Sequence, residues 1–169
     1  MLVRTAFVAT LVSVTALADG AAGIHWTPPP SWQSQGSRPM RAATYTVPAA
    51  AGDSEPGECA VYYFGEGQGG SVADNINRWI GQFEGGQANA KSGKRAIHAL
   101  TVHTIDVSGT YTGMGGPMAP SHTPKPNYRL LGAIVEAPQG SVFFKFTGPS
   151  KTVAANQAKF DAMLDSLAK

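Results

Sequence analysis

The sequence has few charged residues, a single cysteine and no excess of either charge. Charged residues make up 14% of the 169 residues, whereas about a quarter is typical of globular proteins. The 13 Lys and Arg and the 11 Asp and Glu leave a net charge of +2. Proteins that bind nucleic acid usually carry clustered basic residues, so we do not expect a nucleic-acid partner. Because Cys59 stands alone, no internal disulfide can form, and a hydrophobic core has to supply the stability.

Long apolar runs are missing after the first 18 residues. This first segment has a positive start at Arg4, a short apolar run and the small-x-small sequence Ala16-Leu17-Ala18. It is shorter than the run of about 20 apolar residues that spans a membrane. We therefore predict a signal peptide at residues 1–18, cleaved after Ala18, and a secreted or periplasmic protein without a transmembrane segment in its mature chain. Residues 19–169 have the length of a single domain.

Clusters of Gly and Pro divide this domain into segments with the periodicity of strands or helices. Helices are predicted where the apolar residues recur every three or four positions, at residues 71–83 and 152–167. Strands are predicted at residues 24–26, 41–47, 58–64, 99–111, 128–137 and 141–147. Because short links join the later strands, the prediction is an α+β domain with a mainly antiparallel sheet of about six strands flanked by two helices.

Two of the predicted strands are apolar on both faces. Along residues 128–137, Leu130 and Ile134 lie on one face, and Leu131 and Val135 lie on the other. A strand with two apolar faces has to be covered on both sides, which predicts one helix on each face of the sheet. A face that is only partly covered would instead offer a binding surface.

Four parts of the sequence resemble a group of uncharacterised secreted bacterial proteins: Trp26–Trp32, Pro39–Tyr45, Asn75–Trp79 with Gln82-Phe83, and Phe144–Pro149. The opening of tryptophan, prolines and then a strand, with the strand–helix–strand–helix order, resembles the PsbP-like superfamily. This resemblance implies an α/β/α sandwich. Members of the superfamily bind proteins, photosystem subunits or small ligands, so the resemblance does not define an activity and assigns no functional residue.

The helix at residues 71–83 carries the most distinctive polar residues. Asn75, Arg78 and Gln82 are three or four positions apart and share one predicted helix face. One interpretation is a contact surface for a partner or an anionic group, in which Arg78 offers a planar set of donors. The other is that Asn75 or Arg78 binds the carbonyls of a neighbouring loop. Trp79 belongs to the apolar stripe and is predicted to be buried, whereas Arg78 is predicted to face water.

Other candidate sites are less specific. Met114, Met118 and His122 lie in a loop rich in Gly and Pro and offer soft ligands that suit copper(I). Residues 91–95 carry Lys91, Lys94 and Arg95 and are predicted to form a solvated basic turn.

No spacing links the carboxylates and histidines into a catalytic arrangement. Cys59 is predicted to be a buried thiol, and His103 a strand histidine with its hydrogen bonds satisfied.

These observations favour a binding or accessory module without chemistry of its own, which needs no cofactor and whose partner is a protein or a small ligand. Two alternatives stay open. One is a small enzyme whose site lies on the Gly-rich loops and uses Cys59 or His103. The other is a copper-binding protein that uses the methionines and histidine of residues 114–122.

Overall fold

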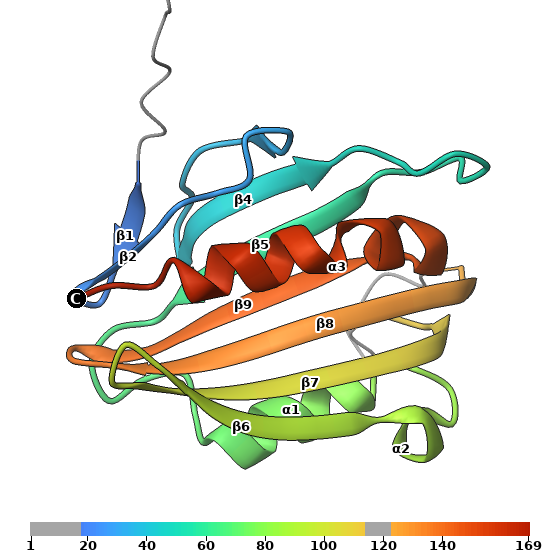
Figure 1. Cartoon of the computed structure of the whole chain (residues 1–169). Helices are drawn as coiled ribbons and strands as arrows, with labels where there is room; N and C mark the ends of the chain where they lie inside the picture. The colour runs from blue at the N-terminus through green and yellow to red at the C-terminus, as the bar shows by residue number, and fades with distance from the viewer. Residues whose placement is uncertain (1–17, 114–122) are drawn as a thin grey trace, which may run out of the picture.

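A computed structural model describes residues 18–113 and 123–169 and contains two sheets and three helices (Figure 1). The main sheet has seven strands in the order β3-β4-β5-β9-β8-β7-β6, and neighbouring strands are antiparallel. These strands are β3 (Gln33–Ser34), β4 (Arg41–Val47), β5 (Gly57–Tyr63), β6 (Lys91–Ile97), β7 (Leu100–Tyr111), β8 (Lys125–Ala137) and β9 (Gly140–Pro149). A small second sheet pairs β1 (Asp19–Ala21) with β2 (Ile24–Trp26). The helices are α1 (Val72–Ile80), α2 (Gly86–Asn89) and α3 (Ser150–Asp165).

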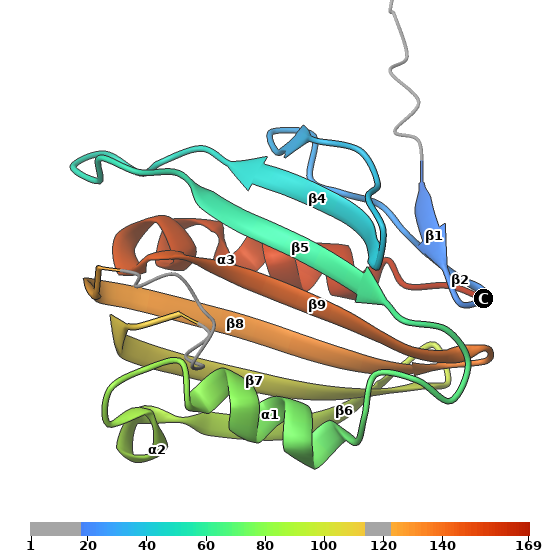
Figure 2. The ribbon, with the colours of Figure 1, turned by 180° about the vertical axis from the view of Figure 1, so that it is seen from behind.

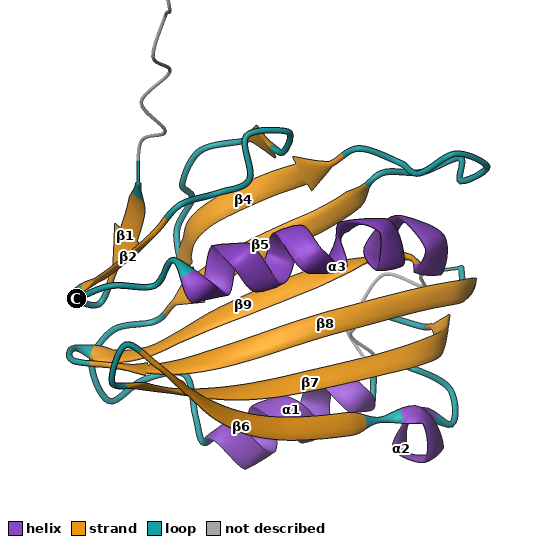
Figure 3. Ribbon diagram, viewed as in Figure 1, coloured by secondary structure: helices purple, strands orange, loops and turns teal. Residues whose placement is uncertain are grey.

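The arrangement confirms the predicted α+β class, the antiparallel sheet and a helix on each face (Figures 1, 2 and 3). The expected number of about six strands is wrong, because the main sheet has seven and a separate pair lies beside it. Among the described residues, no helix is both long and apolar enough to cross a membrane.

The segment predicted as a basic turn is the edge strand β6. Lys91, Lys94 and Arg95 lie on it and pair with Asp106, His103 and Val102 of β7. Six of its seven residues are exposed, so no apolar alternation marks it in the sequence. Positive charges on an edge strand hinder pairing with a further strand. Arg95 also contacts α3 through Asp161 and Asp165, at 3.7 and 3.3 Å.

The helix α1 begins where the sequence predicts and ends earlier. The Ser71 hydroxyl accepts a hydrogen bond from the Asp74 backbone N–H at 3.1 Å and so caps the first turn. Gly81 closes the helix, and the amides of Gln82 and Phe83 then bond three residues back, to Trp79 and Ile80. Gln82 and Phe83 therefore lie in a turn, not in the last helical turn that the sequence predicts.

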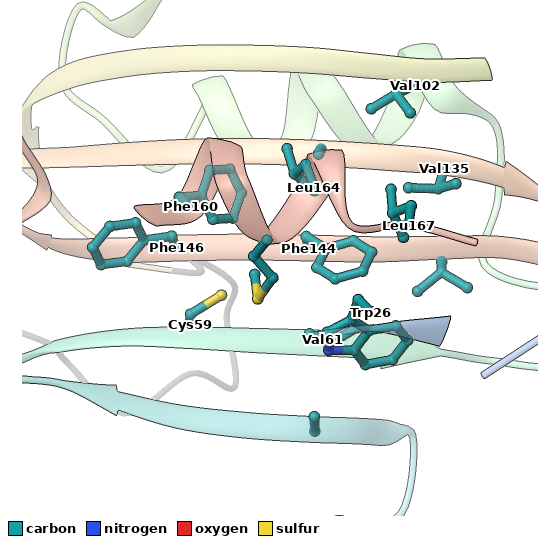
Figure 4. Packing of buried hydrophobic residues seen from close by; sticks show 14 of the residues in the cluster. Trp26, Cys59, Val61, Val102, Val135, Phe144, Phe146, Phe160, Leu164 and Leu167 are labelled. Carbon is teal, nitrogen blue, oxygen red and sulfur yellow. The ribbon is translucent and has the colours of Figure 1, made fainter. Parts of the chain in front are cut away.

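Two hydrophobic cores lie on opposite faces of the sheet. The larger core contains Trp26 of β2, Cys59 of β5, Phe144 and Phe146 of β9, and Phe160 of α3 (Figure 4). Ile24, Trp26 and other residues of the β1–β2 region pack against this core, and the backbone of His25 bonds with that of Ala168 near the C-terminus.

The smaller core joins α1 to the other face. Trp79 and Ile80 pack there with Leu130, Ile134 and Phe143, so the two-faced patterns of β8 and β9 are confirmed. Trp79 is 4% exposed, and it lies against Gly132 of β8, where an added Cβ would come within 2.5 Å of its ring. A glycine at this position allows the indole to approach the strand closely.

Candidate functional site

The helix α1 covers only part of its face of the sheet. Figure 2 shows α1 in front of the half of the sheet that contains β6 and β7, and no helix of the described residues lies in front of β4 and β5. At the boundary between these two areas lies a cavity of about 350 Å³. We call it the α1 cavity, and its walls come from α1, β5, β9 and the start of β4. Its volume is within the usual range of small-molecule sites.

Three cations from three different elements line the α1 cavity: Arg41 of β4, Arg78 of α1 and Lys145 of β9. The Arg41 guanidinium forms an ion pair with Glu58 at 3.2 Å and lies 5.2 Å from the centre of the Tyr62 ring. Arg78 donates to the Asn75 side-chain oxygen. The cavity therefore has an excess of positive charge.

Lys145 is the least solvated of the three cations. Its half-buried ammonium donates to the Gln82 side-chain oxygen at 2.7 Å and lies 5.7 Å from the centre of the Tyr111 ring. Burial lowers the pKa of Lys145 from 10.5 to about 8; the charge of Glu58 opposes this change, and that of Arg41 adds to it. Among the described residues, Lys145 has no carboxylate within ion-pair distance.

Aromatic rings form the apolar wall of the cavity. The Tyr62 and Phe64 rings are nearly parallel, with centres 6.0 Å apart, and Phe143 meets Phe64 edge-on at 5.6 Å. Trp79 closes the wall on the helix side. Burial raises the pKa of the Tyr62 hydroxyl, so this group stays uncharged at neutral pH. The cavity thus combines rings with cations, which is a surface that suits a ligand with an apolar body and a charged group.

All three polar residues singled out on the predicted helix face line this cavity. Arg78 is exposed, as predicted, but Asn75 and Gln82 are 1% and 3% exposed. Asn75 donates to the carbonyl oxygens of Gly69 and Ser71, each at 2.8 Å, which is the loop-binding role of the second interpretation. Gln82 orients Lys145. Asn75 and Gln82 are therefore buried residues that hold the neighbouring loop and Lys145 in place, and they do not form an open contact surface.

A second hollow of about 260 Å³ adjoins the α1 cavity. The two share Arg41, Tyr62 and Lys145 in their walls, so these residues mark the junction. The second hollow is more polar, because Glu58 and Thr147 line it. The buried hydroxyl of Thr147 has no hydrogen-bond partner among the described residues.

Most of the cations in the other cavities have acidic partners. On the α3 side, Arg129 forms two hydrogen bonds with the Asp106 carboxylate, at 2.8 and 2.7 Å. In the hollow beside the β8 start, Lys125 pairs with Glu55 at 2.5 Å. Lys91 lines two of these cavities without an ion pair, but it is exposed on the edge strand β6, whereas Lys145 in the α1 cavity is half-buried.

The residues considered for catalysis or metal binding are elsewhere. Cys59 is fully buried in the larger core, as predicted, and burial raises the pKa of its thiol. The His103 ring lies 2.7 Å from the Glu136 carboxylate, which confirms that its hydrogen bonding is satisfied. Met114, Met118 and His122 lie outside the described residues, and the part of the chain that the structure describes has no group of three His, Cys, Asp or Glu placed to hold a metal.

The strand residues of the site share no local pattern in the sequence. Arg41, Tyr62 and Lys145 come from segments that are distant in the chain, and only the pairing of β4, β5 and β9 brings them together. One signal was present in the sequence. Lys145 is the only charged residue of β9, and it interrupts a run of apolar side chains from Val142 to Phe146.

Comparisons with known proteins find similarity in structure alone. No protein-family model and no curated protein matches the sequence. The solution structure of cyanobacterial PsbP from Synechocystis sp. PCC 6803 is similar, with a TM-score of 0.53 and 11% identity over 95% of this chain and 97% of that one. A crystal structure of a Pseudomonas aeruginosa protein of unknown function, described as a putative regulator, gives a TM-score of 0.49 and 13% identity over 90% and 96% of the two chains. With its antiparallel sheet and a helix on each face of it, the chain has the PsbP-like fold.

Proposed function

We propose that this protein is a secreted or periplasmic binding module that performs no chemistry of its own and binds a ligand in the α1 cavity. The observation that carries the proposal is the meeting of three cations and an aromatic wall around one hollow. A half-buried ammonium without an acidic partner destabilises a fold. Ionisable groups with pKa values shifted by burial are concentrated at functional sites.

The predicted cleavage after Ala18 is compatible with the described fold. Within the described residues, the first strand, β1, begins at Asp19, the residue that follows the predicted cleavage site. The Asp19 carboxylate accepts a hydrogen bond from the Tyr45 hydroxyl, which itself accepts one from the Trp26 indole at 2.8 Å. Cleavage after Ala18 would therefore leave the folded domain intact. N-terminal sequencing of the protein recovered from its native host should give Asp19 as the first residue, and an uncleaved Met1 would contradict export by this route.

The three tryptophans allow a direct test of the binding site. Trp79 lines the α1 cavity, whereas Trp26 and Trp32 lie in the larger core on the other face of the sheet. Each indole N–H gives its own NMR signal, which a Trp→Phe variant assigns. We propose titrating the protein with three probes that share one ring system: naphthoate, naphthylmethanol and naphthylmethylammonium.

Binding in the α1 cavity shifts the Trp79 signal and leaves those of Trp26 and Trp32 in place. The two buried indoles thus act as internal controls, since their N–H groups bond to Tyr45 and Asn156. If no probe shifts Trp79 at millimolar concentration, or if all three indoles shift together, the α1 cavity is not the binding site.

A further inference from the structure

The lining of the α1 cavity also indicates what kind of ligand it binds. We infer that the ligand is an organic anion, with an apolar body and one carboxylate that is held by Lys145 and Arg41. This inference rests on the proposed function, because it takes the α1 cavity as the binding site. It adds the charge and the orientation of the ligand.

The first step is the charge balance of the cavity. All 11 acidic residues of the chain lie in the described part, and of these only Glu58 lines the α1 cavity or the adjoining hollow. Glu58 is bound to Arg41. Lys145 and Arg78 bind amide oxygens, which are neutral. Two of the three positive charges therefore lack a counter-charge within the protein, and a ligand anion would supply it.

The second step is the place of the carboxylate. Lys145 and Arg41 line both hollows, so their charges lie at the junction. The Lys145 ammonium has three N–H donors, and the Gln82 side-chain oxygen accepts a hydrogen bond from one of them. A carboxylate at the junction can accept from the remaining donors and from the Arg41 guanidinium. Desolvation strengthens these bonds, because Lys145 is half-buried.

The third step is the place of the apolar body. Phe64, Phe143 and Met40 line the α1 cavity and are absent from the walls of the adjoining hollow, so they lie away from the junction. Met40 is 65% exposed, and it is the one exposed large hydrophobic residue of the described chain. Its φ of 64° holds it in the left-handed region, which is rare for a residue with a side chain. A ligand body along this wall would cover Met40. The adjoining hollow, with Glu58 and Thr147, is polar and is unfavourable for the apolar body of the ligand.

Aromatic acids and fatty acids share this chemistry, so the test includes both. Calorimetry measures the affinity of the protein for naphthoate, decanoate, naphthylmethanol and naphthylmethylammonium. A shift of the Trp79 indole signal shows whether each compound binds in the α1 cavity. Inorganic phosphate serves as an anion without an apolar body. We expect naphthoate or decanoate, or both, to bind at least about tenfold more tightly than the alcohol, the ammonium and phosphate.

The outcomes separate the two proposals. If the alcohol or the ammonium shifts the Trp79 signal with an affinity equal to that of the acids, the α1 cavity is a binding site but the inference about the anion is wrong. If phosphate binds as tightly as the acids, the apolar body has no part in recognition, and the inference is wrong again. If no compound shifts Trp79, the proposed function fails as well. Binding of naphthoate alone or of decanoate alone identifies the class of body.

Three variants test the role of the charge. Lys145→Met keeps the length of the side chain and removes its charge, so the preference for the acid over the alcohol should fall at least about tenfold. Lys145→Arg keeps the charge and should retain the preference. Lys94→Met removes a charge from the exposed edge strand β6 and should leave the preference for the acid over the alcohol unchanged. A Lys145→Met protein that is folded by circular dichroism and still prefers naphthoate over the alcohol overturns the inference.

The pH dependence of binding to the wild-type protein gives a measurement that does not depend on the fold of a variant. On its own face of the sheet, Lys145 lies with Arg41 of β4 and with Glu58 and Tyr62 of β5 around the two hollows. Arg78 of α1 and Tyr111 of β7 also line these hollows. Guanidinium groups stay charged, and burial raises the pKa of both tyrosines, so these groups keep their charge state between pH 7 and 9. Lys145, with a pKa of about 8, loses its proton in this range. The affinity for naphthoate should fall about three- to tenfold, and Lys145→Arg should abolish the fall; an unchanged affinity at pH 9 contradicts a role for the ammonium.

Discussion

At the scale of single residues, Lys145 shows a conflict between stability and the binding that we propose. Its neighbours along β9, Phe144 and Phe146, are fully buried in the larger core on the opposite face. Its own side chain is half-buried beside two arginines, which disfavours the charged form. A hydrophobic residue would fit the surroundings of β9 at a lower cost to the fold.

This cost predicts a pH dependence of stability. The pKa of Lys145 is about 8 in the folded protein and about 10.5 in an unfolded chain, so the folded state binds fewer protons between these values. Stability therefore rises with pH from about 8 to 10.5. One unit corresponds to about 1.4 kcal/mol, and partial exposure reduces the effect, so we expect a gain of about 1–3 kcal/mol.

Urea denaturation at pH 7 and pH 10 measures this gain when the wild type is compared with a variant that lacks the ammonium. The free energy of unfolding of the wild type, relative to Lys145→Met, should increase from the lower to the higher pH. Lys145→Arg should show no such increase relative to Lys145→Met, because arginine keeps its charge throughout. A constant difference between wild type and Lys145→Met would show that the ammonium is well solvated in the folded state.

At the scale of elements, α1 is a helix of nine residues that depends on its packing. A helix this short is marginal in isolation, so contacts with the sheet have to stabilise it. Trp79 supplies the largest buried side chain of the helix and reaches β8 at Gly132. The adjacent Arg78 lies about 100° around the helix and faces the cavity mouth.

The two neighbours in sequence should therefore respond differently to truncation. Trp79→Ala removes a side chain that is 4% exposed and should lower the free energy of unfolding by about 3–5 kcal/mol. Arg78→Ala should lower it by only about 1 kcal/mol, because the side chain is exposed and its loss removes one hydrogen bond, the one to the Asn75 side-chain oxygen. Denaturant unfolding of both variants measures this. A near-native midpoint for Trp79→Ala would mean that the indole is not part of the core.

Gly132 tests the same contact from the side of the sheet. An alanine Cβ there would lie 2.5 Å from a Trp79 ring carbon and 2.7 Å from an Ile105 methyl, so α1 has to move away. We expect Gly132→Ala to cost about 1–3 kcal/mol in chemical denaturation. Gly81→Ala is a matched control, because its Cβ would meet only ordinary contacts and its backbone is already right-handed. Equal stability of the two variants would contradict the close packing of Trp79 on β8.

At the scale of the whole molecule, the sequence predicts the layers well and the site only in part. The apolar alternation on both faces of β8 and β9 is sufficient to place one helix on each side. The edge strand β6 was missed because its exposure leaves no such alternation. The β1–β2 pair was missed as a sheet because its strands have three residues each.

The candidate site was predicted on the helix but not on the sheet. Asn75, Arg78 and Gln82 share a helical spacing, and this spacing can be read locally. Arg41 and Lys145 meet through the register that pairs β4 with β5 and β5 with β9. Register depends on the turns and on the faces that become buried, so the spacing of one segment cannot reveal it.

The separation of the two cores by one sheet has a consequence for hydrogen exchange. Because the side chains of the two cores do not mix, the layer of α1 can open while α3 and the larger core stay folded. The smaller core contributes less buried surface, so its opening needs less free energy. Native-state exchange should show α1 amides at least about tenfold less protected than those of α3 and β9. Equal protection in both helices would instead describe a molecule that unfolds as a single unit.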